Sequence, residues 1–126
     1  MNLSGAVLKP YMRQAFWAPA NDLLVVVDDV ELPFGKLRFR ATGSSGGHNG
    51  LKSVEHTLGT REYSRLRIGI APYDPNQDRS DLADFVLDRF SKVEDQLMRE
   101  RVAVAGEAVE MWLRDGIGPA MNKFNA

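Results

Sequence analysis

Residues 23–29, LLVVVDD, run five consecutive apolar side chains directly into two carboxylates. A continuous apolar and β-branched run of this length is typical of a strand that is covered on both faces, as in a sheet between helices. The change from apolar to charged residues predicts that Asp28 and Asp29 lie at the carboxyl end of that strand, where open α/β sheets have their ligand sites. The stretch therefore predicts an α/β fold with a candidate site beyond its buried strand.

Two further strands are expected downstream. Residues 36–40 alternate strictly, which predicts a half-exposed strand with Leu37 and Phe39 inward and three bases outward. Residues 66–70 alternate in the same way. Three strands are few for a doubly covered sheet, in which about five or six are usual. We therefore expect a single α/β domain over residues 1–126, three-layered, with a mixed sheet flanked by helices and its N-terminal strand missing.

Helices are expected on both sides of these strands. Residues 3–17 place apolar side chains every four residues, and Pro10 should kink or interrupt the pattern. Residues 51–58 suit a short helix that stops at Gly59. The remaining predicted helical segments are residues 82–90, a long helix from Ser91 to Gly116 with apolar Met98, Val102, Ala105, Val109 and Trp112, and a last turn over residues 119–124.

Composition excludes several classes of protein. The 126 residues are 44% apolar and 26% charged, which is typical of one soluble globular domain. No apolar run approaches the ~20 residues of a membrane span. The absence of cysteine excludes disulfides, thiolate zinc sites and a cysteine nucleophile, and it fits a cytosolic protein.

The charge is unevenly distributed although the net charge is −1. Residues 36–67 carry seven bases against two acids, whereas residues 74–95 carry seven acids against three bases. A basic middle region can mark a polyanion site, and it can equally be charge segregation that forms no patch. We expect Lys36, Arg38, Arg40, Lys52, Arg65 and Arg67 to contribute to a basic face.

Residues 43–50, GSSGGHNG, form a glycine-rich loop that opens a helix. Free backbone N–H groups at a helix start favour anions, and the Asn49 amide suits an amide or a ribose. The alternative is a plain turn that caps the helix, with His48 bonded to the backbone. No metal site is expected, because the carboxylates at residues 28–31 have no nearby histidine or fourth oxygen ligand.

Four blocks of sequence resemble one known family when taken in order. They are MNLSG at residues 1–5, DDVELP at 28–33 with Gly35 and Lys36, GGHNGLKS at 46–53 and RLRIGI at 65–70. Together they closely resemble the bacterial-type peptidyl-tRNA hydrolases, and the resemblance covers essentially the whole chain.

The resemblance implies hydrolysis of the ester that joins a peptide to the 3′ ribose of tRNA. It implies that Asp28 orients the catalytic histidine and that Asn2 and Asn49 hold the peptidyl and terminal-adenosine end. It also places His48 beside the site among the substrate-binding and tRNA-binding residues, without being the base. We therefore expect Asp28, Asn2 and Asn49 to converge at one cleft. The implied protein uses no cofactor or metal, binds the acceptor end of tRNA and no membrane, is monomeric when complete and is cytoplasmic, or organellar if a native N-terminus is missing.

In the family, a segment before the MNLSG block supplies the first strand, another asparagine, a tyrosine and the catalytic histidine. This chain begins at the block, so we expect hydrolysis by the chain as written to be disabled. Two alternatives remain open: a non-catalytic RNA-binding module of the same fold, as in some plant relatives, and an unstable fragment without function.

Overall fold

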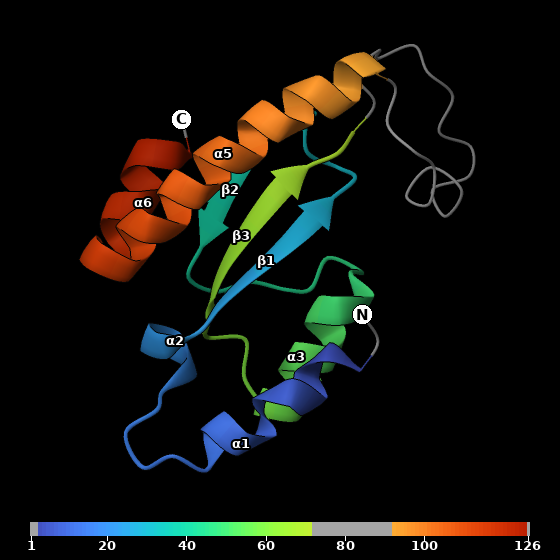
Figure 1. Cartoon of the computed structure of the whole chain (residues 1–126). Coiled ribbons are helices and arrows are strands. Elements are labelled where there is room, and N and C mark those ends of the chain that lie inside the picture. The colour runs from blue at the N-terminus through green and yellow to red at the C-terminus, as the bar shows by residue number, and fades with distance from the viewer. Residues whose placement is uncertain (1–2, 72–91, 126) are drawn as a thin grey trace. The chain divides into compact units, whose positions relative to one another are not determined.

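The computed structural model describes residues 3–71 and 92–125 and has an α/β fold with a mixed three-stranded sheet (Figure 1). The strands are β1 (Leu24–Asp29), β2 (Leu37–Arg40) and β3 (Ser64–Gly69), in the order β1-β3-β2. Figure 1 shows β1 and β3 pointing the same way and β2 the opposite way. The α/β fold class and all three predicted strands are confirmed, and β1 extends through both aspartates.

One face of β1 is more open than its sequence predicts. Val27 is 4% exposed, whereas Val26, whose side chain points to the other face, is 45% exposed. β1 also lies at one end of the strand order, so among the described strands only β3 is its hydrogen-bonded neighbour. The expectation that both faces of this strand are covered is therefore wrong for the described residues.

The helical segments match the predicted helices only in part. They are η1 (Ser4–Leu8), α1 (Lys9–Met12), α2 (Pro19–Asp22), α3 (Asn49–Leu58), α5 (Lys92–Asp115) and α6 (Ile117–Phe124). The helix expected over residues 3–17 reaches only Met12, and α2 is not among the predicted helices. Pro10 lies in the first turn of α1, where its missing N–H needs no partner, so one helical segment ends there and another begins. The helix expected at residues 82–90 lies outside the described residues.

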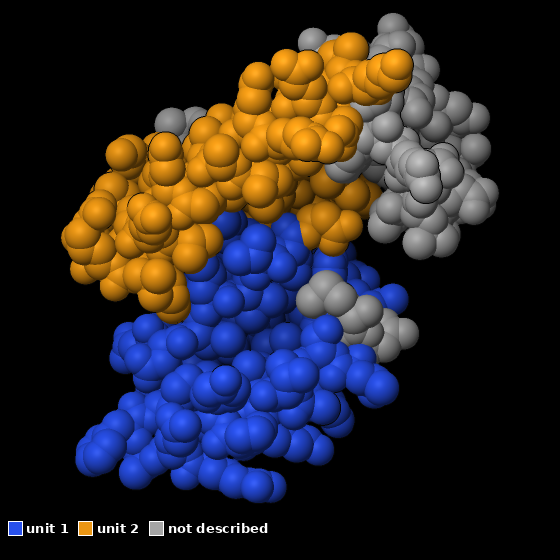
Figure 2. Space-filling model, in the orientation of Figure 1, with its two compact units in different colours: residues 1–27, 39–66 blue, residues 28–38, 67–126 orange. Residues whose placement is uncertain are grey.

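The chain divides into two compact units (Figure 2). Unit 1 comprises Met1–Val27 and Phe39–Leu66, and unit 2 comprises Asp28–Arg38 and Arg67–Ala126. Each strand contributes residues to both units. The single domain over residues 1–126 stays a prediction.

Unit 1 has an apolar core beneath α3. The core consists of Leu8, Val27, Leu51, Val54 and Tyr63, each less than 9% exposed. Leu51 and Val54 are the buried apolar positions of this helix. The helix ends at Gly59, whose φ of +71° is left-handed and favours glycine. Its predicted stop is confirmed.

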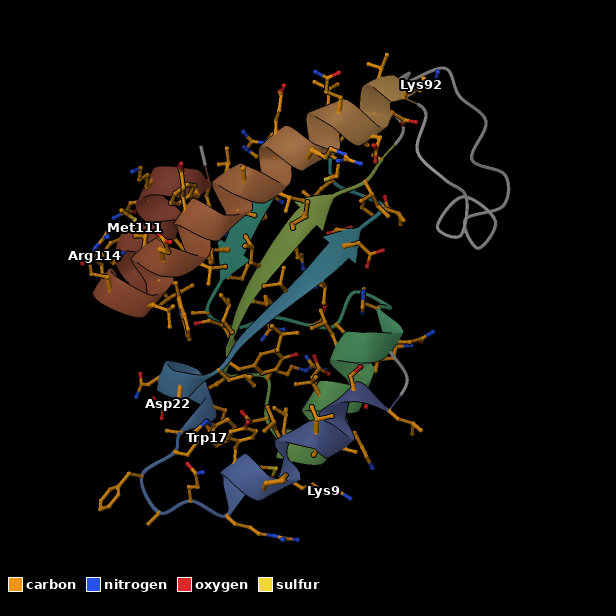
Figure 3. All side chains as sticks on the ribbon, viewed as in Figure 1. Lys9, Trp17, Asp22, Lys92, Met111 and Arg114 are labelled. Carbon is orange, nitrogen blue, oxygen red and sulfur yellow. The ribbon has the colours of Figure 1, made fainter. Side chains whose placement is uncertain are left out.

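Unit 2 contains the long helix α5, which Figure 3 labels near its two ends at Lys92 and Arg114, and α6, which packs against it. The buried positions of α5 are Ala105 and Ala108, whereas Val102 is 53% exposed. The predicted apolar stripe is therefore wrong at Val102. The helix ends before Gly116, whose φ is +87°, as expected.

No helix in residues 3–71 and 92–125 is long and apolar enough to cross a membrane.

Candidate active site

Asp29 organises the turn that follows β1. Its Oδ1 accepts a hydrogen bond from the Glu31 N–H at 2.8 Å, and its Oδ2 lies 3.4 Å from Arg67 Nη1. Its backbone oxygen accepts from the N–H groups of Leu32 at 3.4 Å and Ile70 at 2.9 Å. Both side chains of the Asp29–Arg67 pair are 15% exposed. Asp29 is thus committed to the structure of unit 2.

Asp28 precedes it on β1 and is half-buried. Because side chains alternate along a strand, the Asp28 carboxylate points to the face opposite that of Asp29. Of the two carboxylates after the apolar run, Asp29 holds the local turn and Asp28 remains the candidate for chemistry. Its role in orienting a histidine stays a prediction.

The glycine loop of unit 1 ends in a histidine cap. Gly46 and Gly47 have φ values of +61° and +83°, conformations that L side chains rarely adopt. His48 is the N-cap of α3, and its Nδ1 accepts a hydrogen bond from the Leu51 N–H at 3.3 Å. An Nδ1 atom that accepts a bond carries no proton, so in this arrangement the imidazole has its proton on Nε2. The backbone-bonded interpretation of His48 is therefore confirmed.

Asn49 is the first residue of α3 and its side chain is exposed. It opens onto a groove of about 500 Å³ between the N-terminal helical segment and α3. Ala6 and Lys9 line one wall of this groove, and Lys52 and His56 continue the other wall one and two turns beyond Asn49. Figure 3 labels Lys9, which is exposed. The sequence reasoning missed this groove, whose only signal is the spacing of polar residues along α3.

The MNLSG block packs against the helix that carries Asn49. The Gly5 N–H donates to Ser53 Oγ at 2.9 Å. A Cβ at Gly5 would lie 2.3 Å from the Ser53 carbonyl oxygen, so only glycine allows this approach. Two of the four motif blocks are thus in direct contact within unit 1. Asn2 lies outside the described residues, and the convergence of Asn2, Asp28 and Asn49 stays a prediction.

The predicted basic face is wrong at Arg65, which is 1% exposed. Arg67 is mostly buried beside Asp29, and Lys36 donates through Nζ to the Asn125 backbone oxygen at 3.3 Å. Arg40 and Lys52 are exposed, as the expectation requires. Arginines that alternate on a short strand can point inward when backbone carbonyls are there to accept their hydrogen bonds.

Residues 3–71 and 92–125 contain no group of three or more acidic or histidine side chains that could hold a metal ion.

Comparison with known proteins gives one consistent result. A family model described as peptidyl-tRNA hydrolase matches residues 1–126. The chain is 46% identical over 124 residues to a peptidyl-tRNA hydrolase of Gemmatimonas aurantiaca, and 46% identical over 127 residues to one of Pseudothermotoga lettingae. Among solved structures, peptidyl-tRNA hydrolase from Acinetobacter baumannii matches with a TM-score of 0.82 and 29% identity.

These matches cover nearly all of this chain and less of its relatives. They span 98% and 100% of the chain but 65% of each of the two bacterial sequences. The match to the Acinetobacter structure covers 100% of the chain and 62% of that protein. The four motif blocks, the α/β fold with its mixed sheet and the family match over residues 1–126 agree. The chain belongs to the peptidyl-tRNA hydrolase family.

Proposed function

We propose that the protein acts on peptidyl-tRNA and hydrolyses the ester between the peptide and the 3′ ribose. The observation that carries this proposal is the exposed Asn49 at the start of α3, with Lys52 one turn on, in a chain that the family model matches throughout. An amide at a helix start supplies both a donor and an acceptor for a ribose or a peptide group. A lysine one turn away supplies a positive charge for a phosphate.

In the proposed reaction, a water molecule attacks the ester carbonyl carbon. A histidine takes the proton from that water, and the tetrahedral intermediate then releases the 3′ oxygen of the ribose, which receives the proton. The products are a peptide carboxylic acid and tRNA with a free 3′ hydroxyl. Asp28 holds the histidine in the useful tautomer, while Asn2 and Asn49 hold the substrate. No step needs a cofactor or a metal ion.

The base of this reaction is not one of the two histidines of the sequence. His48 already uses Nδ1 to cap α3, and His56 is exposed on that helix. We therefore propose that the 126-residue chain by itself binds the substrate and hydrolyses it slowly. We also propose a cytoplasmic location and a monomeric state for the protein.

The test compares two proteins on one substrate, an N-acetylaminoacyl-tRNA. One protein is this chain, and the other, the extended protein, is this chain joined at Met1 to the segment that precedes the MNLSG block in the family. A positioned general base contributes about 10²–10⁴-fold, so the extended protein should be faster by that factor. In the extended protein, Asp28→Asn should lower kcat. The matched change Asp95→Asn, at an exposed residue of α5, should not. Equal rates for the short and extended proteins would contradict the assignment of the base.

The second candidate is an RNA-binding module without chemistry. The groove beside Asn49, with Lys9, Lys52 and His56 on its walls, favours this candidate because it depends on no catalytic histidine. It predicts tight tRNA binding by both proteins and no release of amino acid by either. Turnover by the extended protein would exclude it.

A further inference from the structure

Arg65 on β3 is the buried charged residue of the described chain, with 1% of its surface exposed. Burying a guanidinium is costly unless its N–H groups are hydrogen-bonded, so each of its contacts is informative. A residue at this position in a sheet would ordinarily be apolar. The charge therefore needs a reason beyond core packing.

The guanidinium bonds to backbone carbonyls on two separate loops. Nη1 donates to the Gly43 oxygen at 2.9 Å. Nη2 donates to the Tyr63 oxygen at 3.1 Å and also to the Arg61 oxygen. The planar group lies over the Tyr63 ring, with its central carbon 4.0 Å from the ring centroid. Only arginine presents several donors in a fixed plane that can stack and reach both loops at once.

One of these loops precedes α3 in the chain and the other follows it. Gly43 begins the glycine loop that enters the helix through His48, whereas Arg61 and Tyr63 belong to the connection that leaves it after Gly59. All of these residues lie in unit 1. One buried side chain thus joins the segment before the helix to the segment after it.

The glycine loop needs such an anchor. Gly43 has a φ of +141°, and apart from its two chain neighbours no residue within 3–71 and 92–125 comes within 4 Å of where its Cβ would be. A glycine in open space has the greatest conformational freedom of any residue, so side-chain packing does not fix this end of the loop. The bond from Arg65 to the Gly43 carbonyl does fix it, six residues before Asn49.

We propose that Arg65 is a positioning residue for Asn49: it fastens the two loops around α3 and so sets where the Asn49 amide meets the tRNA substrate. This inference rests on the proposed function, because the role of Asn49 does. Arg65 itself is buried and touches no substrate.

The first arm of the test measures the loop without any ligand. Arg65→Lys keeps the positive charge and loses the planar guanidinium with its several N–H donors. The matched control is Arg99→Lys, at an exposed side chain of α5. Amide hydrogen exchange over residues 43–50 and 59–63 should quicken in Arg65→Lys by roughly tenfold beyond the change seen in α5, corresponding to one lost hydrogen bond to a charged group. Exchange that quickens equally everywhere would overturn the proposal.

The unaltered chain gives a second readout if Arg65→Lys does not fold. In arginine side-chain NMR, rotation about the Nε–Cζ bond of Arg65 should be much slower than that of exposed Arg99, because three carbonyls hold its Nη atoms. Equal rotation rates would overturn the anchoring role.

The functional arm is a double-mutant cycle on binding of a tRNA acceptor-stem minihelix that ends in CCA. Arg65→Lys and Asn49→Ala should each weaken binding by about tenfold, and the double variant should be no weaker than Asn49→Ala alone. Full additivity of the two losses would overturn the proposal, since Arg65 would then act independently of Asn49. If the unaltered chain does not bind the minihelix, the proposed function fails, and the exchange arm alone decides whether Arg65 holds the loop.

Discussion

At the scale of single residues, His48 performs a task that Ser, Thr, Asp or Asn usually performs at a helix start. Its Nδ1 accepts the Leu51 N–H, so the nitrogen that could take a proton from water is already used. The family resemblance implies that this histidine is not the base, and the capping geometry gives an independent physical reason for that assignment.

Replacing His48 by alanine should therefore lower the free energy of unfolding by about 1 kcal/mol, the usual cost of losing an N-cap. His48→Asn should retain most of the stability, because the asparagine oxygen can accept the same N–H. The matched control is His56→Ala, which changes an exposed histidine on the same helix and should alter stability little. Urea unfolding of the three variants measures the effect, and equal losses at both positions would contradict the capping role.

The internal partners of single charged side chains could not be predicted from the sequence. The sequence shows two carboxylates after one strand and seven bases in residues 36–67, but it does not show which of these side chains the fold uses internally. Asp29 and Arg67 pair with each other in unit 2, and Arg65 bonds to carbonyls in unit 1. Asp29 and Arg67 are far apart in the chain, and the carbonyls that Arg65 contacts lie in loops, which have no periodic pattern. Only the tertiary contacts reveal them.

At the scale of elements, local patterns predict well where periodicity and breakers agree. Leu37 and Phe39 face inward because the strand alternates, and α3 stops at Gly59 because only glycine readily adopts its φ of +71°. Prediction fails on α5, where Ala108 is fully buried and the larger Val102 is half-exposed. Ala105 of the predicted stripe is buried as expected, whereas Ala108 lies outside the stripe. Close packing of a neighbour favours a small side chain at Ala108, and the spacing of the larger apolar residues does not reveal it.

Contact between η1 and α3 depends on the absence of a side chain at Gly5. In Gly5→Ala, the new Cβ would meet the Ser53 carbonyl oxygen at 2.3 Å, and backbone inside a helix cannot move aside cheaply. We expect a loss of about 1–3 kcal/mol, the range for overpacking. Gly106→Ala on α5 is the matched control: outside its own helical turns, no described residue lies within 4 Å of its Cβ position.

The control should change stability in the opposite direction. Alanine is favoured over glycine inside a helix by about 1 kcal/mol, so Gly106→Ala should raise the free energy of unfolding. Thermal or urea unfolding of both variants gives the two signs directly. A Gly5→Ala protein as stable as the parent would mean that η1 does not pack on α3 through this glycine.

At the scale of the whole molecule, the family assignment and the local chemistry come from different observations. The assignment rests on motif blocks and a match over residues 1–126, although the chain spans only 65% of the two bacterial relatives. The chemistry rests on where single side chains lie within each unit. Binding of tRNA tests whether the family assignment agrees with the positions of the side chains, because binding requires basic side chains that are exposed.

Two bases suit this test: Arg40 and Lys52 are both exposed in unit 1, and Lys52 lies on the groove beside Asn49. Each contact between a base and a phosphate releases condensed counterions, so the logarithm of affinity falls linearly with the logarithm of salt concentration. Arg40→Gln and Lys52→Gln should each weaken tRNA binding and reduce the magnitude of that slope by about one. Arg99→Gln, which removes an exposed base of α5, should leave the slope unchanged.

Arg65 gives this measurement its sharpest contrast, because it lies in the same basic stretch of sequence and is buried. If Arg65 acts only by positioning Asn49, Arg65→Gln, which removes the charge, should lower the affinity for tRNA at every salt concentration and leave the slope as it is. A phosphate contact would instead change the slope when the base is removed. Titration of tRNA at four or five salt concentrations separates the two roles. A slope unaffected by Arg40→Gln and Lys52→Gln would remove both residues from the tRNA-binding surface.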